Sequence, residues 1–520
     1  MVDASRYTLP WLLLACATNG NGPIDGTPEP GEVAAGSHYF ATASDWLSGR
    51  ETYVQGWDGM HHRIALTQKG TDGRWDGYWA DEGGTIVSCI TCSVSDSTST
   101  QRGIGDVFPD GNYVVLTVEK SNHPGVIGDG YAAPGRGLYN DVWIARADGT
   151  QAWQMTNIPA DADHGIIWPR LSADGSKLVW AEMYQGLNLL VPKQQLGSWR
   201  IKLADVVWSA GAPTLSNVQT YEPEAGNFYE TYGFSPDGSQ ILFASSAFMP
   251  GVSDAQIYRV STQLTELTRL SDQHTPGWSN YNEFAFYAPD ADHIIYSRTK
   301  ESTSGGIDYW IMNADGSNQQ RLTYFNEPWS SYSRGYANAG GWALDPTDPD
   351  HLLVGVCSDL VCETSRIMSL RLSAIDGGDG TGLKGDYFAD SWLIWNVMTR
   401  PDPHVGFNWG NDAPAPFLPA DNFAVRWTGS LHPYTTGSHV LCTYADDGAR
   451  LWLDDKLVVD AWYNQGPTEH CNSVWLDATS PASLRLEYYD ASLGATAKLT
   501  WQVPGQTVKE VIPSTQLTPL

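Results

Sequence analysis

The chain has 520 residues, of which 42% are hydrophobic and 17% charged, a composition typical of a globular protein and not of a disordered one. Thirty basic against fifty-nine acidic residues leave a net charge of −29, which repels phosphate backbones and anionic lipid surfaces, so no nucleic-acid partner is expected. The length predicts two or more domains, and 52 glycines, 30 prolines, 23 tryptophans and 25 tyrosines favour short strands joined by tight turns.

The first residues indicate export. An apolar stretch from Leu9 to Ala15 leads into Cys16 and resembles a bacterial lipobox, in which cleavage before the cysteine leaves it free to carry a lipid. We expect a signal over residues 1–16, lipidation at Cys16, and a flexible tether over 17–37, which is rich in Gly, Pro and Asn. An ordinary buried N-terminal segment is the alternative. No other stretch is long and apolar enough to span a bilayer, so we expect the protein to contact a membrane only through the lipid anchor.

The six remaining cysteines favour an oxidising compartment. They fall into three neighbouring pairs, which disulfides would explain: Cys89 with Cys92, Cys357 with Cys362, and Cys442 with Cys471. A redox or zinc motif at Cys89 and Cys92 is the alternative, but a zinc site would need a second matching pair or nearby histidines.

A turn followed by an apolar strand recurs along the first two thirds of the chain. The copies are VFPDGNYVVLTV at 107, LSADGSKLVWAE at 171, FSPDGSQILFAS at 234, YAPDADHIIYSR at 287 and a degenerate LDPTDPDHLLVGV at 344. Second signatures lie between them, DVWIARADGTQAWQMT at 141 and DYWIMNADGSNQQRLT at 308. A repeat of about 55 to 65 residues is typical of four-stranded propeller blades.

This pattern resembles the TolB-type β-propeller repeats. The resemblance implies an all-β fold with a propeller over residues 38–375, which we expect to have six blades, with seven as the alternative and a divergent first blade around residues 38–92. Such propellers serve as protein-docking platforms, as partner domains of hydrolases and as sugar lyases, so the resemblance predicts the fold and not the function.

A glycine-rich linker at 376–382 separates this region from a different C-terminal part. The segments GLKGDYFAD, FNWGNDAPAPFLPADNFAVRWTGSL, YADDGARLWLDDKLVVDAW and LRLEYYDASLGATAKLTW are similar, in order and spacing, to the protective-antigen (PA-14) domain. The resemblance implies a β-sandwich over 383–520. Domains of this family occur in bacterial toxins, glycosidases and yeast adhesins, and many of them bind sugars.

Two adjacent aspartates, Asp446 and Asp447, follow the predicted strand HVLCTY. In the adhesin members of the family, two aspartates at this position are joined by a cis peptide and hold a calcium ion that sugar hydroxyls also contact. The resemblance thus implies a calcium site here, with Asn464 and Gln465 as amide ligands and Trp462 as an aromatic platform on a later loop. The alternative is that the two aspartates cap the turn before Gly448.

In the propeller, Glu230 and Glu283 precede two aligned turns by the same number of residues. We expect both near the start of innermost strands of neighbouring blades, facing the channel, where paired carboxylates can bind a metal or act as acid and base. The alternative is the solvated channel mouth of an acidic protein.

Motifs of several enzyme classes are absent from the sequence. It has no His-Glu-x-x-His, no Gly-x-Ser-x-Gly and no phosphate-binding loop. We expect an exported, surface-attached protein that binds a glycan through its C-terminal domain, with calcium, and whose propeller is a scaffold or a dock for another envelope protein. A polysaccharide lyase or glycoside hydrolase with its site in the channel is the first alternative, and a structural envelope protein is the second.

Overall fold

The structure is a computed structural model that describes residues 38–94, 101–122, 131–187, 196–247, 255–271, 282–288, 290–299, 307–323, 325, 338–357, 365–375, 382–507 and 509–519. The chain divides into two compact units, which hold most of residues 43–372 and most of residues 373–520. The described residues form strands, turns and one 3₁₀ turn, Ser514–Gln516, and no α-helix. In these ranges no helix is long and apolar enough to cross a membrane.

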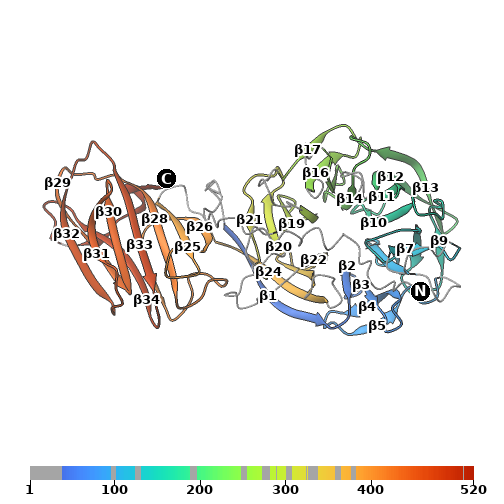
Figure 1. The fold of residues 1–520 in the computed structure, drawn as a ribbon, viewed down its shortest axis with the longest axis horizontal. Coiled ribbons are helices and arrows are strands. Elements are labelled where there is room, and N and C mark those ends of the chain that lie inside the picture. The colour runs from blue at the N-terminus through green and yellow to red at the C-terminus, as the bar shows by residue number, and fades with distance from the viewer. Residues whose placement is uncertain are drawn as a thin grey trace, which may run out of the picture. The chain divides into compact units, whose positions relative to one another are not determined.

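The first unit is a β-propeller. In the described residues it contains six four-stranded sheets that follow one another around a ring (Figure 1), which confirms the expectation of six blades. The strands, sheet by sheet, are β2 (Thr52–Asp58), β3 (Arg63–Lys69), β4 (Trp75–Asp81) and β5 (Ile86–Cys89); β6 (Arg102–Val107), β7 (Tyr113–Glu119), β8 (Asn140–Arg146) and β9 (Ala152–Gln154); β10 (Gly165–Leu171), β11 (Lys177–Gln185), β12 (Ser198–Ser209) and β13 (Ala212–Tyr221); β14 (Tyr229–Phe234), β15 (Gln240–Ser245), β16 (Gln256–Ser261) and β17 (Leu267–Arg269); β18 (Asn282–Tyr287), β19 (His293–Thr299), β20 (Ile307–Asn313) and β21 (Gln320–Arg321); and β22 (Asn338–Leu344), β23 (His351–Cys357), β24 (Ser365–Ile375) and β1 (His38–Ser48).

The first strand corrects one expectation. We expected residues 38–92 to form the first blade, but β1 pairs with β24 and is the outermost strand of the last sheet, whereas the first blade begins at Thr52. The physical reason is ring closure. A chain that ends a propeller with three strands leaves the edge of the third strand open, and the N-terminal segment covers that edge and joins the two ends of the ring.

The innermost strand of every described blade is bulged. The pairing register with the next strand shifts once in β2, β6, β10, β14, β18 and β22, between Val54 and Gly56 in the first and between Thr231 and Gly233 in the fourth. A bulge bends a strand and re-aims its side chains. The repeated shift therefore lies in the six strands that line the centre of the ring.

The core of the propeller consists of separate layers between neighbouring sheets. One such layer contains Ala65, Trp79 and Ile90 from the first sheet against Val114 and Leu116 from the second. Other layers lie between the second and third, third and fourth, fourth and fifth, and sixth and first sheets. The apolar positions of the turn–strand repeat thus fill the faces between blades, which is why that repeat predicts the fold.

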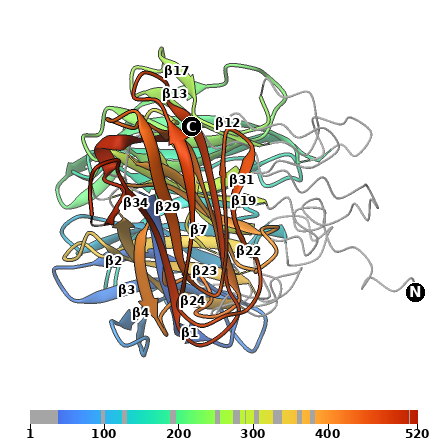
Figure 2. The same ribbon diagram turned by 90° about the vertical axis from the view of Figure 1, so that its left-hand side faces the viewer.

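The second unit is a sandwich of two antiparallel sheets, whose long strands run side by side in Figure 2. Trp427 and Trp501 are fully buried in its core, and β28 alternates between buried and half-buried residues along its second half, as expected of a strand with one face in a core. The first sheet contains β26 (Asn396–Asp402), β25 (Leu383–Phe388), β28 (Phe423–Leu431), β33 (Ala482–Asp490), β30 (Gly448–Leu453), β31 (Lys456–Ala461) and β36 (Leu517–Pro519), and the second contains β27 (Gly406–Gly410), β34 (Ala495–Gln502), β29 (Gly437–Asp446), β32 (Thr468–Leu476) and β35 (Glu510–Val511).

The expected boundaries can be compared with these elements. β24 ends at Ile375 and β25 begins at Leu383, and the division into compact units falls between residues 372 and 373. Within the linker expected at 376–382, residues 376–381 lie outside the described residues, as do the signal expected over 1–16 and the tether over 17–37.

Candidate functional site

The candidate site lies at one end of the sandwich, where four neighbouring strands of the first sheet meet solvent. In the sheet register Phe388 of β25 is opposite Ala424 of β28, Ala424 is opposite Tyr489 of β33, and Tyr489 is opposite Gly448 of β30. The residues that follow β25 and β33 and those that precede β28 and β30 therefore gather at the same end. The loop after β31 joins them, because Ala461 is opposite Ala449.

Asp447 ties two of these loops together. Its Oδ1 accepts a hydrogen bond from the backbone N–H of Gln465 at 3.0 Å, and its Oδ2 accepts one from the N–H of Ala491 at 2.8 Å. The side-chain amide of Gln465 donates to the carbonyl of Asp447 at 3.1 Å. Asp447 is buried, and each of its carboxylate oxygens keeps a second lone pair that a cation can use.

Asp446 contributes a carboxylate that is half-buried and has no hydrogen-bond partner in the described part of the chain. The peptide bond between Asp446 and Asp447 is cis, as the resemblance implied. A Cβ atom added at Gly494 would lie 3.4 Å from Oδ2 of Asp446, so the loop after β33 passes close to this carboxylate. Burial, and then the charge of Asp447, raise the pKa of Asp446.

Asp490 is the site residue that sequence reasoning missed. It ends β33, is 0% exposed, and neither carboxylate oxygen has a hydrogen-bond partner of ordinary geometry. Burial, followed by the charges of Asp447, Asp421 and Asp446, raises the pKa of Asp490 to about 7, and the backbone N–H of Asn422 opposes this rise only in part. The available signal was a strand that ends in aspartate, YYD before ASLG, which also reads as an ordinary turn.

The three residues expected to bind a ligand on the loop after β31, Trp462, Asn464 and Gln465, have different contacts in the structure. Gln465 is held by Asp447, and its Oε1 faces Nε2 of His470 at 2.9 Å. Asn464 accepts a hydrogen bond from the Tyr489 hydroxyl at 2.8 Å. The ring of Trp462 is half-buried, with the Arg450 guanidinium 4.0 Å from its centroid. Of these three residues, Gln465 contacts Asp447. The guanidinium of Arg450 covers one face of the Trp462 ring, which was expected to be the aromatic platform.

This end of the sandwich has a donor set that suits a hard cation, because carboxylate oxygens are its preferred ligands. The unpartnered buried carboxylate of Asp490 is the observation that a cation would explain, since a buried charge without a partner is costly. The carboxylates are not drawn tightly together. In the described residues the groups of three metal-ligating side chains within 4.8 Å are Asp76 with Cys89 and Cys92, and Glu469 with Cys442 and Cys471. A cation here would therefore have to draw its carboxylates closer.

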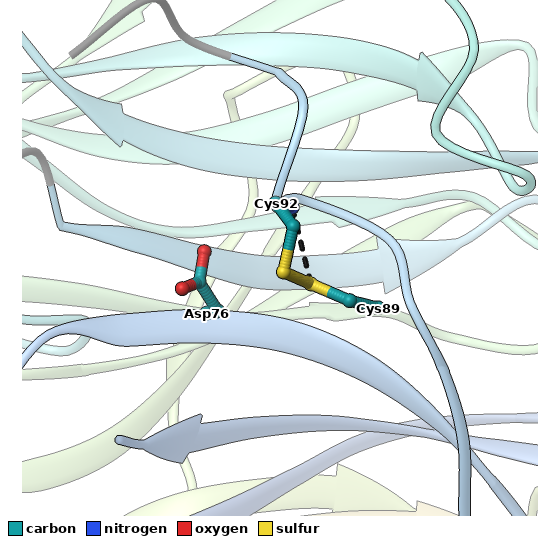
Figure 3. Close-up of side chains that lie close together, drawn as sticks. All are labelled: Asp76, Cys89 and Cys92. Carbon is teal, nitrogen blue, oxygen red and sulfur yellow. Dashed lines mark hydrogen bonds between the residues drawn. A yellow bond between two sulfur atoms is a disulfide. The ribbon is translucent and has the colours of Figure 1, made fainter. Parts of the chain in front are cut away.

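Those two groups are disulfides and not thiolate metal sites. Figure 3 shows the bond between Cys89 and Cys92 beside Asp76, and Cys442 is bonded to Cys471 across β29 and β32. A sulfur in a disulfide is not the thiolate that a metal needs. Asp76 has a different role, since it accepts hydrogen bonds from Thr91 and Arg74 and pairs with Arg102 at 2.9 Å.

The disulfide predictions are confirmed for the two pairs that the structure describes. Cys362 and the lipidation site Cys16 lie outside the described residues, as does the side chain of Cys357. The third pair and the lipid anchor therefore stay predictions.

In the propeller, Glu230 and Glu283 are the second residues of β14 and β18, the innermost strands of neighbouring blades. Glu230 is buried, and its Oε2 accepts a hydrogen bond from the Tyr232 hydroxyl at 2.8 Å. Burial raises the pKa of Glu230 to about 7. Burial, and then the charge of Glu230, raise the pKa of Glu283 well above its ordinary value. The two carboxyl groups thus interact, as a proton-sharing pair does.

The centre of the ring is partly filled at the level of the bulges. Arg170 of β10 is buried and donates from Nη1 to the carbonyls of Gln55 at 3.1 Å and Gly105 at 2.8 Å, which belong to β2 and β6. Its guanidinium carbon also lies 4.8 Å from the centroid of the Trp342 ring on β22. One side chain therefore contacts three other innermost strands and reduces the space for a polymer in the channel.

Comparison with known proteins agrees with this division of the chain. Residues 379–515 match the family model described as PA14 domain. The anti-sigma-I factor RsgI3 of Acetivibrio thermocellus is 37% identical over 145 residues, which are 28% of this chain and 22% of that relative, so the chain spans less than a quarter of the relative's length.

Two solved structures are similar to one part each. A PA14 sugar-binding domain from an RTX adhesin is 17% identical, with 27% of this chain and 99% of that chain covered and a TM-score of 0.23. A putative TolB from Agrobacterium tumefaciens is 15% identical, with 55% and 89% covered and a TM-score of 0.37. The propeller assignment itself rests on the six four-stranded sheets of the described residues. The C-terminal part of the chain, residues 379–515, is a PA14 domain, and it follows a β-propeller that is similar to TolB structures.

Proposed function

We propose that this protein binds a glycan through its PA14 domain, at a calcium site formed by Asp446, Asp447 and Asp490. The observation that carries the proposal is the carboxylate of Asp490, which is fully buried, is affected by the charges of Asp446 and Asp447, and has no hydrogen bond of ordinary geometry at either oxygen. Burying an unpaired charge costs several kcal/mol on an order-of-magnitude scale, and a divalent cation removes that cost.

The proposed roles differ among the three aspartates. Asp446, which is half-buried and unpartnered, would offer its carboxylate from the solvent side, and Asp490 would offer its own from the buried side. Asp447 would bind with its remaining lone pairs while holding the loops that follow β31 and β33. Bound calcium would supply open coordination positions for vicinal sugar hydroxyls. Asn464 and Gln465 support the loop in this proposal, and Trp462 and the exposed Tyr463 lie beside it.

Binding of polysaccharides by the intact protein, in calcium and in chelator, tests this proposal. Retention in an affinity gel should require calcium, and Asp446→Asn with Asp447→Asn should abolish it while circular dichroism stays unchanged. The matched control is Asp454→Asn with Asp455→Asn, an adjacent pair at the hairpin tip between β30 and β31, which should bind like the parent protein. Calcium-independent retention, or equal loss in the control, would refute the calcium-linked site.

A second candidate function is favoured by the carboxyl pair in the propeller. Burial raises the pKa of Glu230 to about 7, and burial together with the charge of Glu230 raises the pKa of Glu283 well above its ordinary value, so this pair favours retaining a proton near neutral pH. This is the state that an acid and base pair needs in a polysaccharide lyase or glycoside hydrolase. Arg170 and Trp342 in the channel leave less room for a polymer, so we rank catalysis below binding.

Export and attachment complete the proposal. Two disulfides favour an oxidising compartment, and the lipobox-like sequence before Cys16 favours a lipid anchor at the cell envelope. In this proposal the propeller is a scaffold or a dock for another envelope protein. A structural envelope protein stays the remaining alternative, and it predicts no saturable glycan binding.

A further inference from the structure

Exposed apolar side chains gather at the same end of the sandwich as the acidic site. Of the fourteen large hydrophobic residues that are exposed in the described part of the chain, five belong to the loops at this end. They are Trp392, Ile394, Trp395, Tyr463 and Leu493, which we call the aromatic rim. Trp392 is 77% exposed and Trp395 55%. Isolated exposed apolar residues are common, but a group of them indicates an interaction surface.

The loop that carries three of these residues is held in place from beneath. Asp390 is buried, and its carboxylate accepts backbone hydrogen bonds from Trp392 and Trp395 at 2.6 Å each and from Ile394 at 3.3 Å. One carboxylate thus fixes a complete turn of backbone while two indoles point outward. A preorganised loop loses less conformational entropy when a ligand covers its side chains.

The rim is continuous with the proposed calcium site. Leu393, between the two tryptophans, packs on a cluster of Phe388, Ala424 and Tyr489, and Ala491 packs on the same cluster. Ala491 donates its N–H to Asp447. On the other side, the N–H of Leu493 donates to Asp421 at 2.7 Å. The loop that carries Leu493 therefore contacts Asp447 and Asp421 through its backbone, and the charges of these two residues and of Asp446 act on Asp490.

This combination restricts the chemistry of the ligand. Residues 381–520 contain fifteen acidic and eight basic residues, so an anionic lipid surface or an acidic polymer is repelled. A bilayer would also have to cover the carboxylates, at a large desolvation cost. A chain of neutral pyranoses suits both the exposed apolar side chains and the carboxylates, because its C–H faces pack on indole rings and its hydroxyls bind polar groups and cations.

We infer that the aromatic rim binds additional sugar units of an extended neutral polysaccharide whose nearest unit occupies the aspartate site. This inference rests on the proposed function and adds the ligand class to it. The aspartate site alone serves a single sugar unit, whereas the rim makes affinity depend on chain length. Trp392 and Trp395 are then residues that determine specificity for polymers over monosaccharides.

The test compares a double variant of the intact protein with a single-residue control variant. Trp392→Ala with Trp395→Ala removes the two exposed indoles, and the loop-supporting Asp390 and Leu393 stay in place. The matched control is Trp475→Ala. Trp475 is 74% exposed, but it lies opposite Ser438, eight residues along β29 from Asp446, which is roughly 26 Å at the rise of a strand. Affinity gels with xyloglucan, galactomannan and mixed-linkage β-glucan measure polymer binding, and calorimetry measures the corresponding monosaccharides.

We expect the double variant to bind its neutral polymer at least about tenfold more weakly, with unchanged monosaccharide affinity and calcium response, and the Trp475 variant to bind normally. Undiminished polymer binding by the double variant would overturn the inference and leave the proposed function standing. Loss in the double variant but not in Asp446→Asn with Asp447→Asn would uphold polymer binding by the rim, but it would refute both the calcium site and the placement of the nearest sugar unit there. Selective binding to polygalacturonate, or to phosphatidylglycerol vesicles, would overturn the assignment of a neutral polymer. Binding to no sugar at all would overturn both proposals.

Discussion

Replacing Asp490 with asparagine removes a buried charge without changing the shape of the side chain. The pKa of Asp490 is about 7 in the folded protein, against an ordinary value of 3.8. Because the folded state binds the proton more tightly than the unfolded state, the contribution of this group to stability is fully present below about pH 4 and is lost as the pH rises through about 7. At 1.36 kcal/mol for each pH unit, the loss is about 4 kcal/mol.

This loss should appear as a pH-dependent difference between the two proteins. In chelator, Asp490→Asn should raise the free energy of unfolding of the sandwich relative to the parent, by little at pH 4 and by about 4 kcal/mol at pH 8. Millimolar calcium should stabilise the parent at pH 8 and not the variant. Urea unfolding of residues 380–520, followed by tryptophan fluorescence, measures both effects.

Two results would refute this reasoning. A difference that does not change between pH 4 and pH 8 would mean that Asp490 is not a buried titrating group. A variant that is less stable than the parent at pH 8 in chelator would mean that the carboxylate has a stabilising partner in the folded protein. Asp421→Asn is the control, since Asp421 is exposed and already accepts a hydrogen bond from the backbone N–H of Leu493.

Three further predictions concern other parts of the molecule. Cys442→Ser with Cys471→Ser should lower the free energy of unfolding of the sandwich by about 3 kcal/mol in urea, because the disulfide closes a loop of 29 residues, and an unchanged value would mean that the sheet alone fixes this loop. Glu230→Gln with Glu283→Gln should raise the melting temperature of the propeller at pH 8 but not at pH 5, since the pKa of each carboxyl is raised by burial. An equal change in the calorimetric melting temperature at both pH values would contradict this. Any polysaccharide turnover should fall at least about tenfold in the same variant. Deletion of residues 38–48 should lower the melting temperature of the propeller because it opens the edge of β24, and an unaffected transition would show that ring closure does not depend on β1.

The sequence predicts most of the propeller because its signals are local. Each copy of the turn–strand repeat, such as FSPDG before QILFAS, builds a turn and then a strand whose apolar residues face the next blade. The place of β1 has no such signal, since its pairing with β24 joins residues more than three hundred positions apart and follows only from closing the ring. The register that places Glu230 and Glu283 on neighbouring inner strands follows from the aligned turns.

The sequence predicts only those residues of the candidate site that belong to a recognisable motif. Asp446 and Asp447 stand out as adjacent aspartates in a segment that is similar to a known family. Asp490 and the loop from Asp390 to Trp395 do not stand out in the sequence, because their roles depend on neighbours in three dimensions. The carboxylate of Asp490 is buried with no hydrogen bond of ordinary geometry, and the carboxylate of Asp390 holds the backbone of the exposed Trp392 and Trp395. The family resemblance implied Asn464 as an amide ligand, and in the structure its amide oxygen accepts a hydrogen bond from the Tyr489 hydroxyl.

Calorimetric titration of calcium into the intact protein tests the central claim most directly. The claim is that Asp446, Asp447 and Asp490 form a cation site on which glycan binding depends. We predict saturable binding of one calcium ion per chain below millimolar concentration, lost in Asp490→Asn and in Asp446→Asn with Asp447→Asn, and strengthened by a bound polysaccharide. No heat of binding up to millimolar calcium in the parent protein would contradict the claim and would make Asp446 and Asp447 a turn cap.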